Sequence, residues 1–120
     1  MTQTSLEQSL LVFKVLSDPN RLRLYWLLTH VGDAICVGEA MRVLDLPQYE
    51  TSKHLKQLRE AGLVEAEKRG RFVYYKIKPF DSLFVSGIEQ AVNAIDPDSF
   101  KEDKKHCKEI CCCFSNEEEK

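Results

Sequence analysis

Apolar and polar residues in the first part of the chain follow the period of an α-helix. The sequence TSLE at residues 4–7 is typical of a capping box, and a helix is predicted from there to about Leu16. Asp18 and Pro19 suit the N-cap and the first position of a second helix, which Gly32-Asp33 would end. The apolar face of that second helix comprises Leu24, Leu27, Leu28 and Val31.

Two further helices are predicted on either side of a tight turn. The first of them covers residues 37–44, and its apolar side comprises Val37, Ala40, Met41 and Leu44. Pro47 cannot continue a helix but can begin one, so the next helix is predicted from Pro47 to Ala61. Gly62 is its expected left-handed terminator. Leu55 and Leu58 are expected to face the core.

The period changes from helical to alternating after Gly62. Residues 63–78 predict two short strands joined at Arg69-Gly70, because Gly70 supplies the positive φ that a tight hairpin needs. One face of the hairpin carries Val73, Tyr75 and Ile77. Pro79 is predicted to start a last helix that reaches Ile95. Its apolar face is wider than a peripheral helix of so small a domain needs, so part of it is expected to pack against another subunit.

This order of elements predicts the fold class. The chain should be mainly α with a small β-hairpin, in the order α-α-α-α-β-β-α of the winged helix-turn-helix. In that fold the fourth helix enters a major groove of DNA, and the tip of the hairpin reaches the adjacent backbone or minor groove. Residues 1–98 are expected to form this domain, and residues 99–120 a cysteine-rich tail without apolar periodicity outside the cysteines.

The distribution of charge agrees with a DNA-binding surface. The chain has 17 basic and 19 acidic residues and a net charge of −2, yet residues 53–78 contain eight basic and three acidic residues, a net charge of +5. A local basic stripe is the electrostatic signature of a phosphate-binding surface. No run of about 18 apolar residues and no signal-peptide pattern is present, so we expect a cytoplasmic protein. No nucleophile with a neighbouring base is apparent, which argues against an enzyme.

Two stretches resemble a known family. LSDPNRLRLYWLL at residues 16–28 and TSKHLKQLREAGLVEAEKRGRFVYYKI at residues 51–77 are similar to the ArsR/SmtB family of metal-responsive repressors, and the likeness extends over about residues 10–95. The resemblance implies a homodimer that binds a pseudo-palindromic operator and leaves it when a toxic metal or metalloid ion binds. A resistance operon would thereby be derepressed.

The predicted DNA-binding residues lie on the fourth helix and the hairpin: Gln48, Tyr49, Ser52, Lys53, His54, Lys56, Arg69 and Arg71. Base edges are normally read from the N-terminal half of the recognition helix. Gln48 is suited to a bidentate contact with adenine, and Lys53 or His54 to guanine or phosphate. Pro47 stands where the family usually has Ser or Thr, so the helix cap differs from the family pattern.

The third helix does not carry the family's arsenic site. The arsenic-sensing branch has ELCVCDLC there, whereas this chain reads AICVGEAM at residues 34–41. Cys36 alone cannot supply three thiolates, so it is expected to be a buried small apolar residue. The zinc and cobalt site that other members carry on the last helix is missing too, because residues 80–95 contain no histidine.

The candidate inducer site is therefore the tail, which holds four of the five cysteines: Cys107, Cys111, Cys112 and Cys113. Such crowded cysteines cannot staple distant parts of a fold, so metal binding or redox chemistry is expected instead. As(III) or Sb(III) is the predicted inducer. Its predicted ligands are Cys107, Cys111 and Cys112, with Cys113 as a substitute.

Other readings of the tail stay open. Four soft donors also suit Zn(II), Cd(II), Pb(II) or Cu(I). A disulfide or persulfide switch on the same fold is a second alternative, and a cysteine-rich metal-binding module that does not bind DNA is a third. The spacing of the cysteines does not choose among them.

Overall fold

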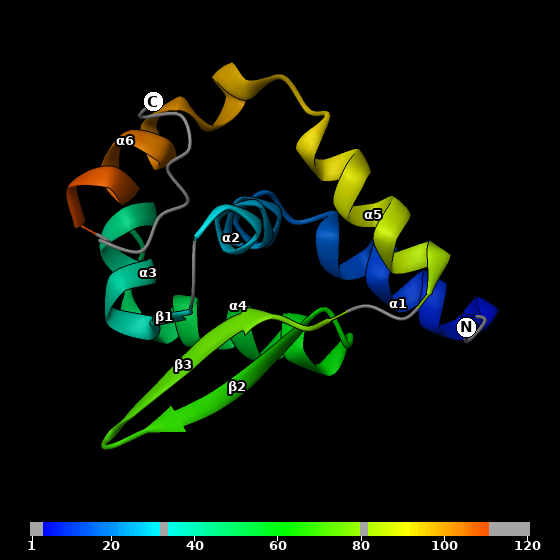
Figure 1. The fold of residues 1–120 in the computed structure, drawn as a ribbon, viewed down its shortest axis with the longest axis horizontal. Coiled ribbons are helices and arrows are strands. Elements are labelled where there is room, and N and C mark those ends of the chain that lie inside the picture. Colours follow the sequence, from blue (N-terminus) through cyan, green and yellow to red (C-terminus); the bar gives the residue numbers. More distant parts are fainter. Residues whose placement is uncertain (1–3, 32–33, 80–81, 111–120) are drawn as a thin grey trace.

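The computed structural model describes residues 4–31, 34–79 and 82–110. Figure 1 shows the elements in chain order: α1 (Leu6–Leu16), α2 (Pro19–His30), β1 (Ile35–Cys36), α3 (Val37–Leu44), α4 (Gln48–Glu60), β2 (Val64–Arg69), β3 (Phe72–Ile77), α5 (Leu83–Asn93), the 3₁₀ turn η1 (Pro97–Phe100) and α6 (Lys101–Ile110). Helix α2 lies at the centre, with α3 and α6 on one side, α1 and α5 on the other, and α4 with the hairpin below. The predicted winged helix-turn-helix is confirmed.

Helix α2 begins where the sequence predicts and supplies much of the core. The carboxylate of Asp18 accepts hydrogen bonds from the backbone N–H groups of Asn20 (2.9 Å) and Arg21 (3.2 Å). These are two of the orphan donors at the helix N-terminus. Leu24 and Leu27 are fully buried. Each such side chain contributes roughly 1.5–3 kcal/mol of transfer free energy.

The turn between α3 and α4 is held by backbone geometry. Asp45 adopts a left-handed conformation with φ 58°, and the N–H of Leu46 donates to the carbonyl of Met41 at 3.1 Å. This is the usual way in which a helix C-terminus satisfies its last carbonyls. Helix α4 starts at Gln48 after the extended Pro47 and ends before Gly62, which has φ 83°. The prediction for Gly62 is confirmed.

The hairpin forms as predicted, and a third strand joins it. Strands β2 and β3 are antiparallel with Val64 opposite Ile77 and Arg69 opposite Phe72, and Gly70 in the connection has φ 66°. The short strand β1 pairs with the other edge of β3, which gives the order β1-β3-β2. Strand β1 was not predicted from the sequence, because two residues are too few for an alternating pattern.

Helix α5 begins later than predicted. It starts at Leu83 and not at Pro79, and the hydroxyl of Ser82 caps it by accepting from the N–H of Val85 at 3.2 Å. A serine N-cap outweighs a proline that merely permits a helix. The helix ends at Asn93, short of the predicted Ile95.

The expectation that residues after 98 form a tail without apolar periodicity was wrong for its first half. Phe100 is buried and stacks on Trp26 with a centroid distance of 4.5 Å, and Cys107 on α6 is fully buried. Phe100, Asp103, Cys107 and Ile110 form a helical stripe, but a buried aspartate at its second position hides the pattern. Within the described residues, no helix is long and apolar enough to cross a membrane.

Candidate nucleic-acid interface

Helix α4 is fixed against α2 by polar contacts on its inner side. The side-chain amide of Asn20 donates to Oε2 of Glu50 at 3.3 Å, and Nη1 of Arg21 donates to Oε1 of Gln57 at 2.7 Å. The hydroxyl of the buried Thr51 donates to the carbonyl of Pro47 at 2.9 Å. These bonds hold both ends of α4, so its outer side has a defined orientation.

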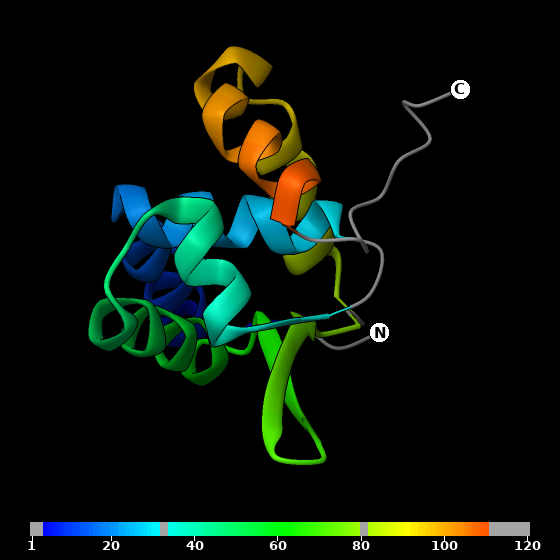
Figure 2. The same ribbon diagram turned by 90° about the vertical axis from the view of Figure 1, so that its left-hand side faces the viewer.

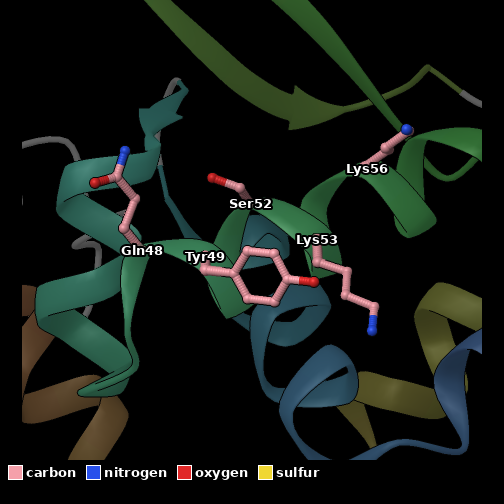
Figure 3. Close-up of a pocket in the computed structure, with 5 residues that line it drawn as sticks. All are labelled: Gln48, Tyr49, Ser52, Lys53 and Lys56. Carbon is pink, nitrogen blue, oxygen red and sulfur yellow. The ribbon is translucent and has the colours of Figure 1, made fainter.

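The outer side of α4 presents a row of polar side chains to solvent. Figure 3 shows the five residues that line a shallow hollow there: Gln48, Tyr49, Ser52, Lys53 and Lys56. All five are exposed, and Tyr49 is 80% accessible. Each of them is among the DNA contacts predicted from the sequence. Two amines, a hydroxyl, a phenol and an amide on adjacent turns can donate to phosphate oxygens and to base edges alike.

His54 does not belong to that row, which corrects its assignment as a DNA contact. The residue is only 6% exposed and its side chain lies on the inner side of α4, with Nε2 3.4 Å from Oε2 of Glu50. The helical period explains the difference, because position 54 falls beside Thr51, Leu55 and Leu58, which are also buried. The helical spacing of the apolar residues on this side of α4 was the signal in the sequence that could have excluded His54 from the predicted DNA contacts.

Near its tip, the wing exposes Lys68 and Arg71, whereas Arg69 is half-buried. Nε of Arg69 lies 3.4 Å from Oε2 of Glu67, and its guanidinium lies 5.0 Å from the centroid of the Tyr74 ring. Lys76 also pairs with Glu67, and the hydrogen bond from Arg69 together with these charges lowers the pKa of Glu67. Arg71 is exposed and has no ion pair with any described residue. Of the two predicted wing contacts, Arg71 is therefore the better placed.

The structure brings the start of α4 and the wing to one hollow. Gln48 and Arg71 both line a groove between α3, α4 and β3, together with Cys36 and Met41. Cys36 is partly exposed there as the N-cap residue of α3, which corrects the expectation that it is buried. Its backbone N–H donates to Oε1 of Glu39 at 3.2 Å. The groove thus joins the two elements that were predicted separately to contact DNA.

The predicted inducer site is only partly within the described residues. Cys107 lies on α6 with no exposed surface, whereas Cys111, Cys112 and Cys113 lie outside the described residues. Over the described ranges, no group of three or more His, Cys, Asp or Glu side chains is placed to hold a metal ion. A cysteine sulfur such as that of Cys107 is suited to a thiophilic ion, but in this structure the side chain is buried and an ion cannot reach it from solvent.

The fold and this surface define a class of protein, the winged helix-turn-helix DNA-binding proteins. Residues 16–67 match the family model described as a helix-turn-helix domain. Two solved structures are similar: HlyU from Vibrio cholerae (TM-score 0.62, 25% identity, 77% of this chain and 95% of that one) and a homodimeric winged helix-turn-helix DNA-binding domain from Mycobacterium bovis (TM-score 0.60, 25% identity, 79% and 89%).

Curated relatives identify the family. The arsenic resistance transcriptional regulator ArsR1 of Pseudomonas putida is 33% identical over 96 residues, which cover 76% of this chain and 74% of the relative. The cadmium resistance transcriptional regulatory protein CadC of Listeria innocua is 42% identical over 66 residues, 55% of each chain. The chain belongs to the ArsR/SmtB family of winged-helix transcriptional regulators. Family membership also confirms the prediction that it is not an enzyme.

Proposed function

We propose that the protein is a homodimeric repressor that binds operator DNA through α4 and the wing and leaves it when a thiophilic ion binds the C-terminal cysteines. The observation that carries the proposal is the exposed row on α4, whose orientation is fixed by buried contacts on the opposite side of the same helix. A rigid helix with donors on one side is what major-groove readout needs.

The proposed DNA contacts have distinct roles. Gln48 at the start of α4 is suited to read a base edge, because its amide matches the donor and acceptor pair of adenine. Lys53 and Lys56, further along the helix, would neutralise phosphates. Arg71 on the wing would contact the backbone or the minor groove beside the site that α4 reads. His54 is not part of this set.

An exposed apolar surface on α1 and α5 supports the proposed dimer. These helices lie side by side in Figure 1, and the rings of Phe13 and Phe84 pack edge to face at 5.5 Å. Next to this contact, Leu10 is 57% exposed and Leu83 is 77% exposed. Large apolar residues gathered in this way are typical of protein interfaces. The similar domain from Mycobacterium bovis is described as homodimeric.

The proposed inducer is As(III) or Sb(III), bound by Cys107, Cys111 and Cys112 with Cys113 as a substitute. Crowded thiolates and relatives named for arsenic resistance support this choice. Relatives named for cadmium resistance favour Cd(II) or Zn(II) as a second candidate with the same thiols. Either ion must bind the free protein more tightly than the DNA-bound protein, because a ligand shifts an equilibrium only by differential affinity.

Fluorescence anisotropy of reduced protein on DNA from its own promoter region tests the proposal. Arsenite, antimonite, Cd(II), Zn(II) and an oxidant are added in turn at fixed salt. We expect arsenite or antimonite to release the DNA, and we expect a variant with all four C-terminal cysteines changed to Ser to bind DNA without being released. The matched control is Cys36→Ser, which should respond like the wild type. Persistent release from the fourfold variant would place the inducer site elsewhere.

A further inference from the structure

Side chains of α6 and α2 donate hydrogen bonds to the C-terminal end of α3. The last carbonyls of a helix have no partner within that helix. The carbonyl of Val43 accepts from Nδ1 of His106 on α6 at 3.0 Å, so this ring nitrogen carries the proton. The carbonyl of Leu44 accepts from Nη2 of Arg23 on α2 at 3.0 Å. The end of α3, from which the chain turns into the recognition helix, is therefore capped by side chains of two other helices.

Arg23 is itself held by α6. Its Nε donates to Oδ2 of Asp103 at 2.9 Å and its Nη2 donates to Oδ1 at 2.8 Å, a two-point contact between guanidinium and carboxylate. Asp103 is 4% exposed, whereas the side chain of Arg23 is 30% exposed. Loss of the Asp103 carboxylate would remove the two acceptors that fix the guanidinium of Arg23 in place. The position of Arg23 thus depends on α6 remaining docked.

A continuous series of hydrogen bonds leads from α6 to the recognition helix. Asp103 holds Arg23, and Nη1 of Arg23 donates to Oδ1 of Asn20 at 2.7 Å. The amide nitrogen of the same Asn20 donates to Oε2 of Glu50 on α4 at 3.3 Å. Figures 1 and 2 both show α6 lying against α3, on the far side of α2 from the wing. Helix α6 is therefore connected to α2 and α3 directly, and to α4 through Arg23 and Asn20. A change in the position of α6 can reach the recognition helix without involving α5.

Cys107 lies on the same face of α6 as Asp103, one helical turn further on. Its side chain has no exposed surface, because this face packs against the core. Because the thiol is fully covered, an ion can reach it only if this face of α6 moves away from the core. The contacts of Asp103 and His106 with α2 and α3 would then be lost, since both residues lie within the same turn of helix.

We propose that α6 is a clamp: its docked position holds the turn between α3 and α4 in the DNA-binding geometry, and ligation of Cys107 excludes docking. The second half of this inference rests on the proposed function, whereas the first half does not. Asp103 and His106 act as positioning residues, because they touch neither DNA nor ion. Because ligation of Cys107 would exclude docking, the ion would bind the free protein more tightly than the DNA-bound protein. Release from DNA requires this difference in affinity.

The first test uses Asp103→Asn with no ion present. We expect its operator affinity to fall by a factor in the range of about 5 to 150 that is typical of allosteric coupling. We also expect iodoacetamide to alkylate Cys107 faster than in the wild type, as measured by peptide mass spectrometry, because the thiol is more often uncovered. The matched control is Glu109→Gln, which removes the same charge from an exposed position on α6 and should change neither quantity.

A second test uses only the wild-type protein, so it does not depend on whether a variant folds. If DNA binding requires docked α6, saturating operator DNA must shift wild-type α6 toward the docked position and slow the alkylation of Cys107 by at least the factor of affinity that Asp103→Asn loses, because coupling between two equilibria is reciprocal. An equal concentration of DNA without the operator should have a smaller effect. An alkylation rate of Cys107 that is unaffected by operator would overturn the clamp, as would a faster rate in Asp103→Asn without any loss of operator affinity.

These tests separate the clamp from the proposed inducer. If arsenite fails to release the wild-type protein from DNA while operator still protects Cys107, the inducer assignment is wrong and the clamp stands. If arsenite releases the DNA but neither Asp103→Asn nor operator changes the alkylation of Cys107, the inducer assignment stands and the clamp is wrong. His106→Ala, which removes the bond to Val43, should repeat the effect of Asp103→Asn in weaker form.

Discussion

Nη1 of Arg21 donates to Oε1 of Gln57 across a distance of 2.7 Å and so joins the first turn of α2 to the last turn of the recognition helix. The same guanidinium donates through Nε to the carbonyl of Val15 on α1, also at 2.7 Å. One side chain therefore connects three helices at the base of the DNA-binding unit. Its planar fork makes this possible, because its donors point in two fixed directions.

Arg21→Lys should destabilise the protein although the charge is kept. A lysine ammonium cannot reach both oxygen acceptors with the geometry of the fork, so at least one hydrogen bond of a charged donor, worth about 1.5–3 kcal/mol, is lost. Urea unfolding followed by circular dichroism measures the change. The control is Arg59→Lys on the exposed side of α4, which should stay within about 0.5 kcal/mol of the wild type. Equal stability of the two variants would contradict this account of Arg21.

Replacing the lysines of α4 and replacing its first residue, Gln48, should weaken DNA binding in different ways. Lys53→Ala and Lys56→Ala together should lower affinity for all sequences and reduce the slope of log affinity against log salt by about 0.9 per lost phosphate contact. Gln48→Ala should leave the slope unchanged and relax specificity at one base pair, at a cost of about 1–3 kcal/mol. Anisotropy titrations at several salt concentrations separate the two effects. Lys101→Ala, on the exposed surface of α6, is the control for charge.

The cap of α2 should make stability depend on acid pH. Partial burial alone would raise the pKa of Asp18, but hydrogen bonds from the N–H groups of Arg21 and Asn20 lower it overall. A carboxyl whose pKa is lower in the folded state stabilises the protein above its unfolded pKa of about 3.9, and this contribution is lost as pH falls through the folded pKa. Asp18→Asn caps the helix without titrating, so its stability should fall less than that of the wild type on acidification below about pH 4. At neutral pH, Asp18→Ala should cost about 0.5–2 kcal/mol. Unfolding by urea at a series of pH values measures both effects, and parallel pH curves for wild type and Asp18→Asn would refute the first.

The exposed apolar surface on α1 and α5 should decide the oligomeric state. Leu10→Glu or Leu83→Glu places a charge where the proposed interface requires apolar contact, so sedimentation should show a monomer with unchanged helix content. Operator affinity should fall with it, because two half-sites are no longer bound together. Phe72→Glu on the wing is the matched control, since Phe72 is equally apolar and 54% exposed but lies away from α1 and α5. It should remain a dimer.

Local signals in the sequence predicted much of the fold. Gly62 and Gly70 have positive φ values because a helix terminator and a tight hairpin require them, and Asp18 and Pro19 mark the start of α2 by their own hydrogen-bonding chemistry. The helical stripe of α1 was also read correctly as a helix. It contains Leu6, Leu10 and Phe13, which are exposed in the single chain. Periodicity identifies a helix but does not tell which partner covers its apolar side.

Other features depend on contacts between distant parts of the chain. Helix α6 was not predicted, because Asp103 breaks its apolar stripe and is tolerated only by its pairing with Arg23, 80 positions earlier. All five exposed residues of the row on α4 were among the positions predicted from the sequence, since polar residues at helical spacing are visible there. His54 was misplaced because a histidine is compatible with either side of a helix, and only the neighbouring buried residues decide between them.

The pairing of β1 with β3 determines which segment must be exchanged as a unit in a chimera with another winged-helix protein. Ile35 and Cys36, which lead into α3, lie opposite Tyr75 and Tyr74 in the same sheet that carries the wing. The inclination of the wing against the recognition helix is therefore fixed by a ladder that begins before α3. A chimera that exchanges only the hairpin would sever this ladder, whereas one that transfers residues 35–77 as a block carries the whole DNA-reading geometry with it.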